Sequence, residues 1–70
     1  MQDDHLFSAT LALLADGALI EQRASAPLTY RMLYQGESLP LSGGIVQRLR
    51  MGKHIREVCT VNGRKRFCRR

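Results

Sequence analysis

Apolar residues recur at helical spacing near the start of the chain, and this pattern predicts a first helix over about residues 4–15. One broad apolar stripe is formed by Leu6, Phe7, Thr10, Leu11, Leu13 and Leu14. Asp3 and Asp4 are candidate N-caps whose charge suits the positive end of the helix dipole. Gly17 follows as a candidate C-cap that can adopt a positive φ. The stripe is most simply interpreted as the face that packs on the core.

The next segments alternate between apolar and polar residues, which indicates strands. Residues 18–20 are expected to form a short strand, and residues 24–27 a turn or loop. In residues 28–34 every second side chain is apolar or aromatic, namely Leu28, Tyr30, Met32 and Tyr34. This alternation predicts a second strand. The rival interpretation makes residues 28–35 the second helix of a helix-turn-helix.

A second helix is predicted over residues 42–51, with Ser42 as its N-cap and Gly52 closing it in the same way that Gly17 closes the first. Its inner face carries Ile45, Val46 and Leu49. The glycines at 43 and 44 each cost about 1 kcal/mol of helix stability relative to alanine. Either the close approach of a backbone or a phosphate, or a crowded helix–strand contact, would explain that cost. The preceding residues combine a Gln-Gly turn signal with Pro40, so no helix is expected there.

The final segment predicts a β-hairpin, because Asn62-Gly63 supplies the two positive-φ residues of a type I′ turn. The expected cross-strand pairs are Val61 with Arg64, Thr60 with Lys65, Cys59 with Arg66, and Val58 with Phe67. We expect Val58 and Phe67 to face the core. Arg64, Arg66 and Arg70 should share the other face with Cys59 and Cys68. The two cysteines would be diagonal neighbours about 7–8 Å apart, whereas a disulfide prefers roughly 5.5–6 Å, so two free thiols are expected.

Charge is distributed unevenly along the 70 residues. Residues 1–47 carry two arginines against five acids, a formal −3, whereas residues 48–70 carry nine cations against Glu57, a formal +8, which gives +5 overall. Such asymmetry favours a polyanion or an acidic protein surface as partner, although cations also simply solubilise an exposed end. No apolar run approaches the roughly 20 residues of a membrane span, and no basic segment precedes the apolar start. A cytoplasmic protein is therefore expected.

These elements predict a single α+β domain over residues 1–70, with the order α-β-β-α-β-β. A helix with cations ahead of a basic hairpin is the arrangement of winged-helix proteins, so we expect a small winged-helix-like domain whose C-terminal hairpin is the wing. His5 and His54 are far apart in the sequence, and two cysteines do not make a zinc-site spacing. We expect neither catalysis nor a bound metal or cofactor.

Three stretches of the chain resemble the small bacterial YjhX toxin family: TLALLADGALI (10–20), YQGESLPL (34–41) and the segment from Ile45 to Phe67. Members of that family are thought to have a winged-helix-like fold. The founding member is described as a toxin that binds and inhibits bacterial DNA topoisomerase I. The resemblance therefore implies the same fold and, as an expectation, a partner protein that this chain binds and inhibits.

Binding of duplex DNA is the function that the residues themselves best support. In a winged-helix mode, helix 42–51 would enter a groove and the wing, residues 56–70, would contact the adjacent backbone. Arg48 or Arg50 could read guanine and Gln47 adenine. The candidate binding residues are Gln47, Arg48, Arg50, Met51, Lys53, Arg64, Lys65, Arg66, Arg69 and Arg70.

Two other hypotheses stand beside DNA binding. The first is a toxin-type or anti-host inhibitor that binds a partner protein, such as bacterial DNA topoisomerase I, through an acidic or DNA-mimicking surface. The second is a homodimer-forming subunit in which an exposed Met51, or an edge strand near residues 28–34, mediates self-association.

Overall fold

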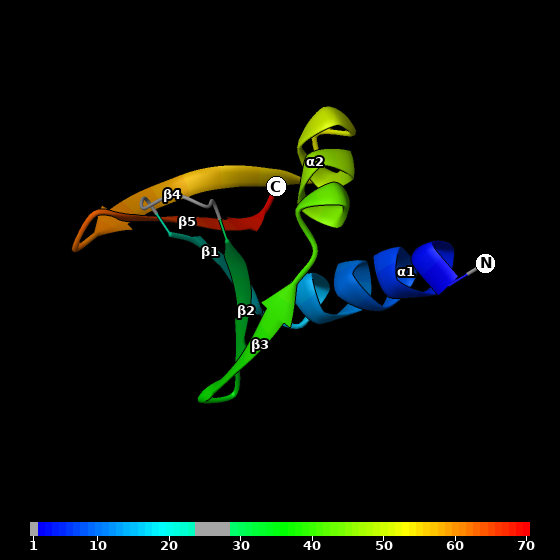
Figure 1. The fold of residues 1–70 in the computed structure, drawn as a ribbon, viewed down its shortest axis with the longest axis horizontal. Helices are drawn as coiled ribbons and strands as arrows, with labels where there is room; N and C mark the ends of the chain where they lie inside the picture. The colour runs from blue at the N-terminus through cyan, green and yellow to red at the C-terminus, as the bar shows by residue number, and fades with distance from the viewer. Residues whose placement is uncertain (1, 24–28) are drawn as a thin grey trace.

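The computed structural model describes residues 2–23 and 29–70, which form two helices and one five-stranded antiparallel sheet. In chain order the elements are α1 (Gln2–Ala15), β1 (Leu19–Gln22), β2 (Tyr30–Tyr34), β3 (Glu37–Leu41), α2 (Gly43–Met51), β4 (Ile55–Val61) and β5 (Arg64–Arg69). The strands are ordered β3-β2-β1-β5-β4. Both helices lie on one side of the sheet, and the β4–β5 hairpin extends away from them (Figure 1). The loop expected at residues 24–27 lies outside the described residues.

The α+β class is confirmed, but the expected element order is wrong because it omits β3. This strand pairs with β2 through a turn in which Gln35 and Gly36 have φ of 49° and 79°. Pro40 is compatible with β3 because the strand lies at the edge of the sheet. β2 lies between β1 and β3. The helix-turn-helix alternative is therefore excluded, and the expectation of an edge strand near residues 28–34 is wrong.

The hydrophobic core lies between the two helices and one face of the sheet, which we call the inner face. Ile20 of the central strand β1 lies opposite Met32 of β2 and Phe67 of β5, and all three side chains are buried. The rest of the core is formed by Leu14, Ala18, Ile45, Val46, Leu49 and Ile55. Because side chains alternate along a strand, the neighbours of these three residues point to the opposite face. We call that the outer face, and no helix of the described residues covers it.

The first helix begins at Gln2, so Asp3 and Asp4 lie inside its first turn and the expectation that they cap it is wrong. The helix ends as expected. Gly17 has a φ of 101°, and the N–H groups of residues 17 and 18 donate to carbonyl groups of the last turn at 3.1 and 3.0 Å. This is the Schellman pattern, and it confirms Gly17 as the C-cap glycine.

The second helix ends with the same pattern, but a different residue type provides the positive φ. The N–H groups of Lys53 and His54 donate to the carbonyls of Arg50 and Leu49 at 3.1 and 2.9 Å. Lys53 has a φ of 57°, whereas Gly52 has a φ of −81°. The expectation that Gly52 closes α2 as Gly17 closes α1 is therefore wrong by one residue. A lysine adopts the left-handed conformation that usually favours glycine.

The C-terminal hairpin has the expected register near its turn and departs from it further along. The pairs Val61–Arg64, Thr60–Lys65 and Cys59–Arg66 are confirmed. A β-bulge between residues 57 and 59 then places Glu57, rather than Val58, opposite Phe67. Val58 is 48% exposed, while Phe67 is only 4% exposed. Phe67 therefore anchors the hairpin to the core without Val58. Both cysteines are free, as expected.

Candidate nucleic-acid interface

The exposed face of α2 is centred on Gln47 and Met51. The opposite face is turned to the core by the buried residues Ile45, Val46 and Leu49. Arg48 and Arg50 are two residues apart, or about 200° around the helix axis, so they lie on opposite flanks of the exposed face. The sequence places these four candidate binding residues together, and the structure separates the two arginines.

Arg48 is held against α1. Its guanidinium lies 4.2 Å from the centre of the Phe7 ring, and Nη1 lies 3.4 Å from Asp4 Oδ1. The Phe7 ring also meets the ring of His54 edge-on, with 5.6 Å between their centroids. This flank of α2 is therefore an aromatic and ionic contact between the helices.

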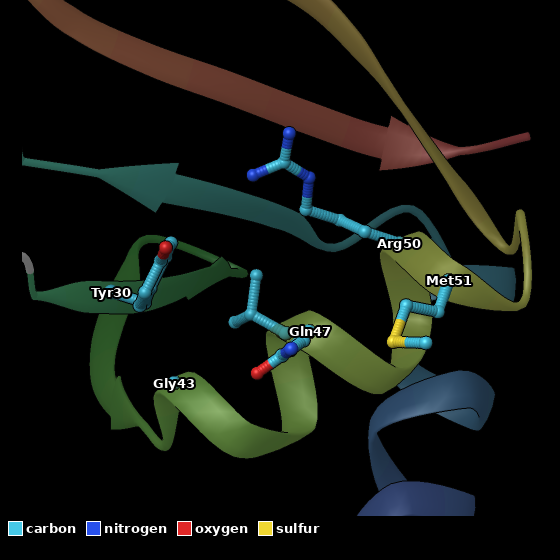
Figure 2. A pocket seen from close by; sticks show the side chains of 6 residues that line it. Tyr30, Gly43, Gln47, Arg50 and Met51 are labelled. Atoms are coloured by element: carbon cyan, nitrogen blue, oxygen red, sulfur yellow. The ribbon is translucent and has the colours of Figure 1, made fainter.

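Arg50 lies on the other flank, beside a cleft of about 530 Å³ between α2 and the inner face of the sheet. The cleft is lined by Tyr30, Gly43, Val46, Gln47, Arg50 and Met51. Figure 2 shows Arg50 reaching from α2 toward β1 and β5, with the side chain of Tyr30 rising from β2. The Arg50 guanidinium lies 5.5 Å from the centre of the Phe67 ring, an attraction that holds the cation over the sheet. The cleft thus combines apolar walls with a cationic rim.

The first turn of α2 is formed by a capped pair of glycines. The Oγ of Ser42 accepts a hydrogen bond from the N–H of Gly44 at 3.2 Å, which confirms Ser42 as the N-cap. A Cβ atom at Gly43 would lie 3.5 Å from the Tyr30 ring, and one at Gly44 would lie 3.6 Å from the Oγ of Ser42. Both are ordinary van der Waals distances. The described residues therefore contain no crowded contact that requires either glycine.

The hairpin divides its cations between the two faces of the sheet. Lys65 alternates with Phe67 and lies on the inner face, and Arg69, opposite Ile55, shares that face. Arg64 and Arg66 lie on the outer face. The structure thus brings Arg50, Lys65 and Arg69 to one side of the sheet, and it places Arg64 and Arg66 on the other.

Glu21 is a buried acid on the outer face that the sequence reasoning missed. Its side chain is 8% exposed, and its two carboxylate oxygens lie 3.5 Å from Arg64 Nη1 and 3.3 Å from Arg66 Nε. Arg31 lies directly opposite Glu21 on β2. Glu21 and Arg66 are 45 positions apart in the chain, so their contact follows from the pairing of β1 with β5. The one sequence signal is a lone acid directly after the apolar run 18–20.

The remaining candidate residues lie near the junction of α2 and β4. Lys53 is exposed and occupies the positive-φ position described above. Arg70 is also exposed, and its backbone N–H donates to the carbonyl of His54 at 2.9 Å. This bond ties the end of β5 to the start of β4, so Arg70 lies beside the C-terminal end of α2.

Within residues 2–23 and 29–70, no group of three or more His, Cys, Asp and Glu side chains is placed to hold a metal ion. None of the helices in the same part of the chain is long and apolar enough to cross a membrane.

Comparison with known proteins adds no relative. No family model, curated protein or solved structure matches this chain. The resemblance to the YjhX family therefore stays a prediction.

Proposed function

We propose that this protein is a small, basic DNA-binding regulatory protein that acts in the cytoplasm as a winged-helix-like domain. The exposed face of α2, with Gln47 and Met51 at its centre, would enter a groove of duplex DNA. Arg50 and Lys65 would bind the phosphates beside that groove, and the β4–β5 hairpin would act as the wing. The observation that carries the proposal is the alignment of Arg50, Lys65 and Arg69 on the side of the sheet that holds α2.

Electrostatics support a phosphate partner at this surface. Glu57 is the one acid that the β4–β5 register places on the inner face, opposite Phe67, while Lys65 and Arg69 lie on the same face two residues before and after Phe67. Phosphate contacts by arginine and lysine supply most non-specific affinity and weaken steeply with salt. Gln47 and Met51 add a polar and an apolar group for the base edges, in the place where a recognition helix carries them.

The test compares two arginines on the same helix by fluorescence anisotropy with a labelled duplex across a range of salt concentrations. Arg50→Gln should weaken binding and reduce the salt slope by about 0.9, the value for one lost phosphate contact. Arg48→Gln removes the same charge from the same helix, but on the flank that packs on Phe7 and Asp4. It should leave the slope nearly unchanged. Equal losses in both variants, or no binding by folded wild-type protein, would reject the proposal.

A second candidate function is inhibition of a partner protein, with bacterial DNA topoisomerase I as the partner that the YjhX resemblance implies. Met51 favours it, because a methionine that is 77% exposed beside an arginine suits a protein interface. A pull-down from bacterial lysate after nuclease treatment tests this function. Capture of topoisomerase I without nucleic acid, lost in Met51→Ser, would favour inhibition over DNA binding.

A further inference from the structure

The outer face of the sheet carries a second group of cations, separate from those beside α2. The strand registers place Arg31, Arg56, Arg64 and Arg66 on this face. One cross-strand row over β2, β1 and β5 is formed by Arg31, Glu21 and Arg66. Arg56 lies on β4, opposite Cys68 of β5. Glu21 offsets one of the four charges, so these five residues carry a formal +3.

Glu21 also fixes the positions of two guanidinium groups. Its carboxylate is buried and contacts Nη1 of Arg64 at 3.5 Å and Nε of Arg66 at 3.3 Å. Each arginine uses one nitrogen in this contact, and the other donors of each fork remain for a further acceptor. The side chains of Arg64 and Arg66 are 48% and 33% exposed, so these donors can be reached from solvent. Two arginines held by one buried acid form a preorganised site for phosphate oxygens.

We propose that the two faces of the sheet bind separate duplexes, so that a single chain bridges two DNA segments. This inference rests on the proposed DNA binding at α2 and adds a second site, on the outer face. Side chains that alternate along β5 point to opposite faces, Lys65 to the inner face and Arg64 and Arg66 to the outer face. A duplex that lies on the inner face therefore leaves the outer cations free for a second duplex.

Duplex DNA suits the outer face better than single-stranded nucleic acid or a second copy of the chain. The four aromatic residues, Phe7, Tyr30, Tyr34 and Phe67, lie on α1 or on the inner face, so the outer face offers no ring on which a base could stack. Two copies that met through their outer faces would bring +3 against +3. Phosphates along a duplex present the opposite charge at regular spacing.

Repulsion between the two duplexes does not prevent this arrangement. Charges in water at physiological ionic strength are screened over about 8 Å. Phosphates that lie further apart than this length, across the sheet and α2, would therefore repel each other weakly. At the hairpin a single strand separates the two duplexes, and each duplex gains its own cation contacts there, Lys65 on one face and Arg64 and Arg66 on the other.

The experiment is native mass spectrometry of the wild-type chain with two duplexes of different length, both in excess over protein. The expected species contains one chain and both duplexes. The outer pair Arg31→Gln and Arg56→Gln, and the inner pair Arg50→Gln and Lys65→Gln, remove the same charge. Each double variant should keep the one-duplex complex and lose the two-duplex complex by about tenfold, because one surface has lost two phosphate contacts. Arg31 and Arg56 are chosen because changing both Arg64 and Arg66 would remove the two ion-pair partners of buried Glu21. Circular dichroism checks that each variant folds.

Three results would overturn bridging, and they differ from the failure of DNA binding itself. The wild-type chain would give a one-duplex complex and nothing larger, or the outer pair would leave the two-duplex complex intact. A complex of two chains with two duplexes would show that self-association joins the DNA. Failure of DNA binding would instead remove the one-duplex complex as well.

Discussion

At position 53, which follows α2 and is exposed, glycine should make the protein more stable than alanine does. Lys53 has a φ of 57°, and it provides the positive-φ residue of the Schellman motif that ends α2. The left-handed conformation costs an L-residue roughly 1–2 kcal/mol. Glycine escapes this cost but loses about 0.4–1 kcal/mol more than alanine through the freedom of its unfolded chain. Lys53→Gly should therefore exceed Lys53→Ala in stability by about 0.5–1 kcal/mol.

The comparison between glycine and alanine removes the lysine charge from the result. A cation near a helix C-terminus contributes about 0.3–1 kcal/mol, and both variants lose it equally. Thermal unfolding followed by circular dichroism should place the melting temperature of Lys53→Gly about 2–8 °C above that of Lys53→Ala, because 1 kcal/mol shifts a domain of this size by about 4–8 °C. Gly17→Ala provides the mirror control: with a φ of 101° at the same motif position in α1, it should lower the melting temperature. Equal melting temperatures for the two Lys53 variants, together with a destabilised Gly17→Ala, would refute the assignment of Lys53 to the left-handed position.

Three further predictions concern the sheet, α1 and the first turn of α2. The hydrogen bond from the Tyr34 hydroxyl to Asp16, with desolvation and the Asp16 charge, raises the pKa of Tyr34. The stabilising effect of this hydrogen bond is present below about pH 10 and is lost as the pH rises through the raised pKa. Urea titrations above pH 10 should show that the free energy of unfolding falls more steeply for wild type than for Tyr34→Phe. Parallel falls would contradict this prediction. Phe67→Ala should cost about 3–5 kcal/mol and Val58→Ala less than about 1 kcal/mol, measured by urea denaturation; the reverse order would place the bulge elsewhere. Gly44→Ala should raise stability by about 1 kcal/mol, since a Cβ there meets only the Oγ of Ser42 at 3.6 Å, and a lower melting temperature would contradict it.

The hairpin shows how far local sequence signals determine the structure. Asn62-Gly63 fixes the turn, with φ of 52° and 76°, and from there the register of three residue pairs follows by counting. Counting fails at Val58 because a bulge adds one residue to β4, and no residue type in this stretch demands it. The prediction that Phe67 is buried survives, because Phe67 lies on β5, which contains no bulge.

β3 was missed for a different reason. Gln35-Gly36 has the same positive-φ geometry as the second turn, with φ of 49° and 79°. However, the strand after it is mostly exposed and contains Pro40, so it lacks the alternation that indicates a strand. It is a strand because β2 offers it a free edge. Glu21 was missed in the same way, since its partners Arg64 and Arg66 come into reach only when β5 pairs with β1.

Three of the locally unfavourable residues of this chain lie at the two ends of α2. Gly43 and Gly44 each lower the stability of the first turn of α2 by about 1 kcal/mol relative to alanine. Lys53, after the last turn, adopts the left-handed conformation. Packing does not require the two glycines, because both sites would accept a Cβ at ordinary distances. Local conflicts of this kind are expected where an element serves a function other than stability. If α2 is the DNA-binding element, Gly44→Ala should be more stable than wild type, and Lys53→Gly more stable than Lys53→Ala. Both Gly44→Ala and Lys53→Gly should bind DNA more weakly than wild type. A gain in stability with unchanged affinity would show that these local costs are not connected with DNA binding.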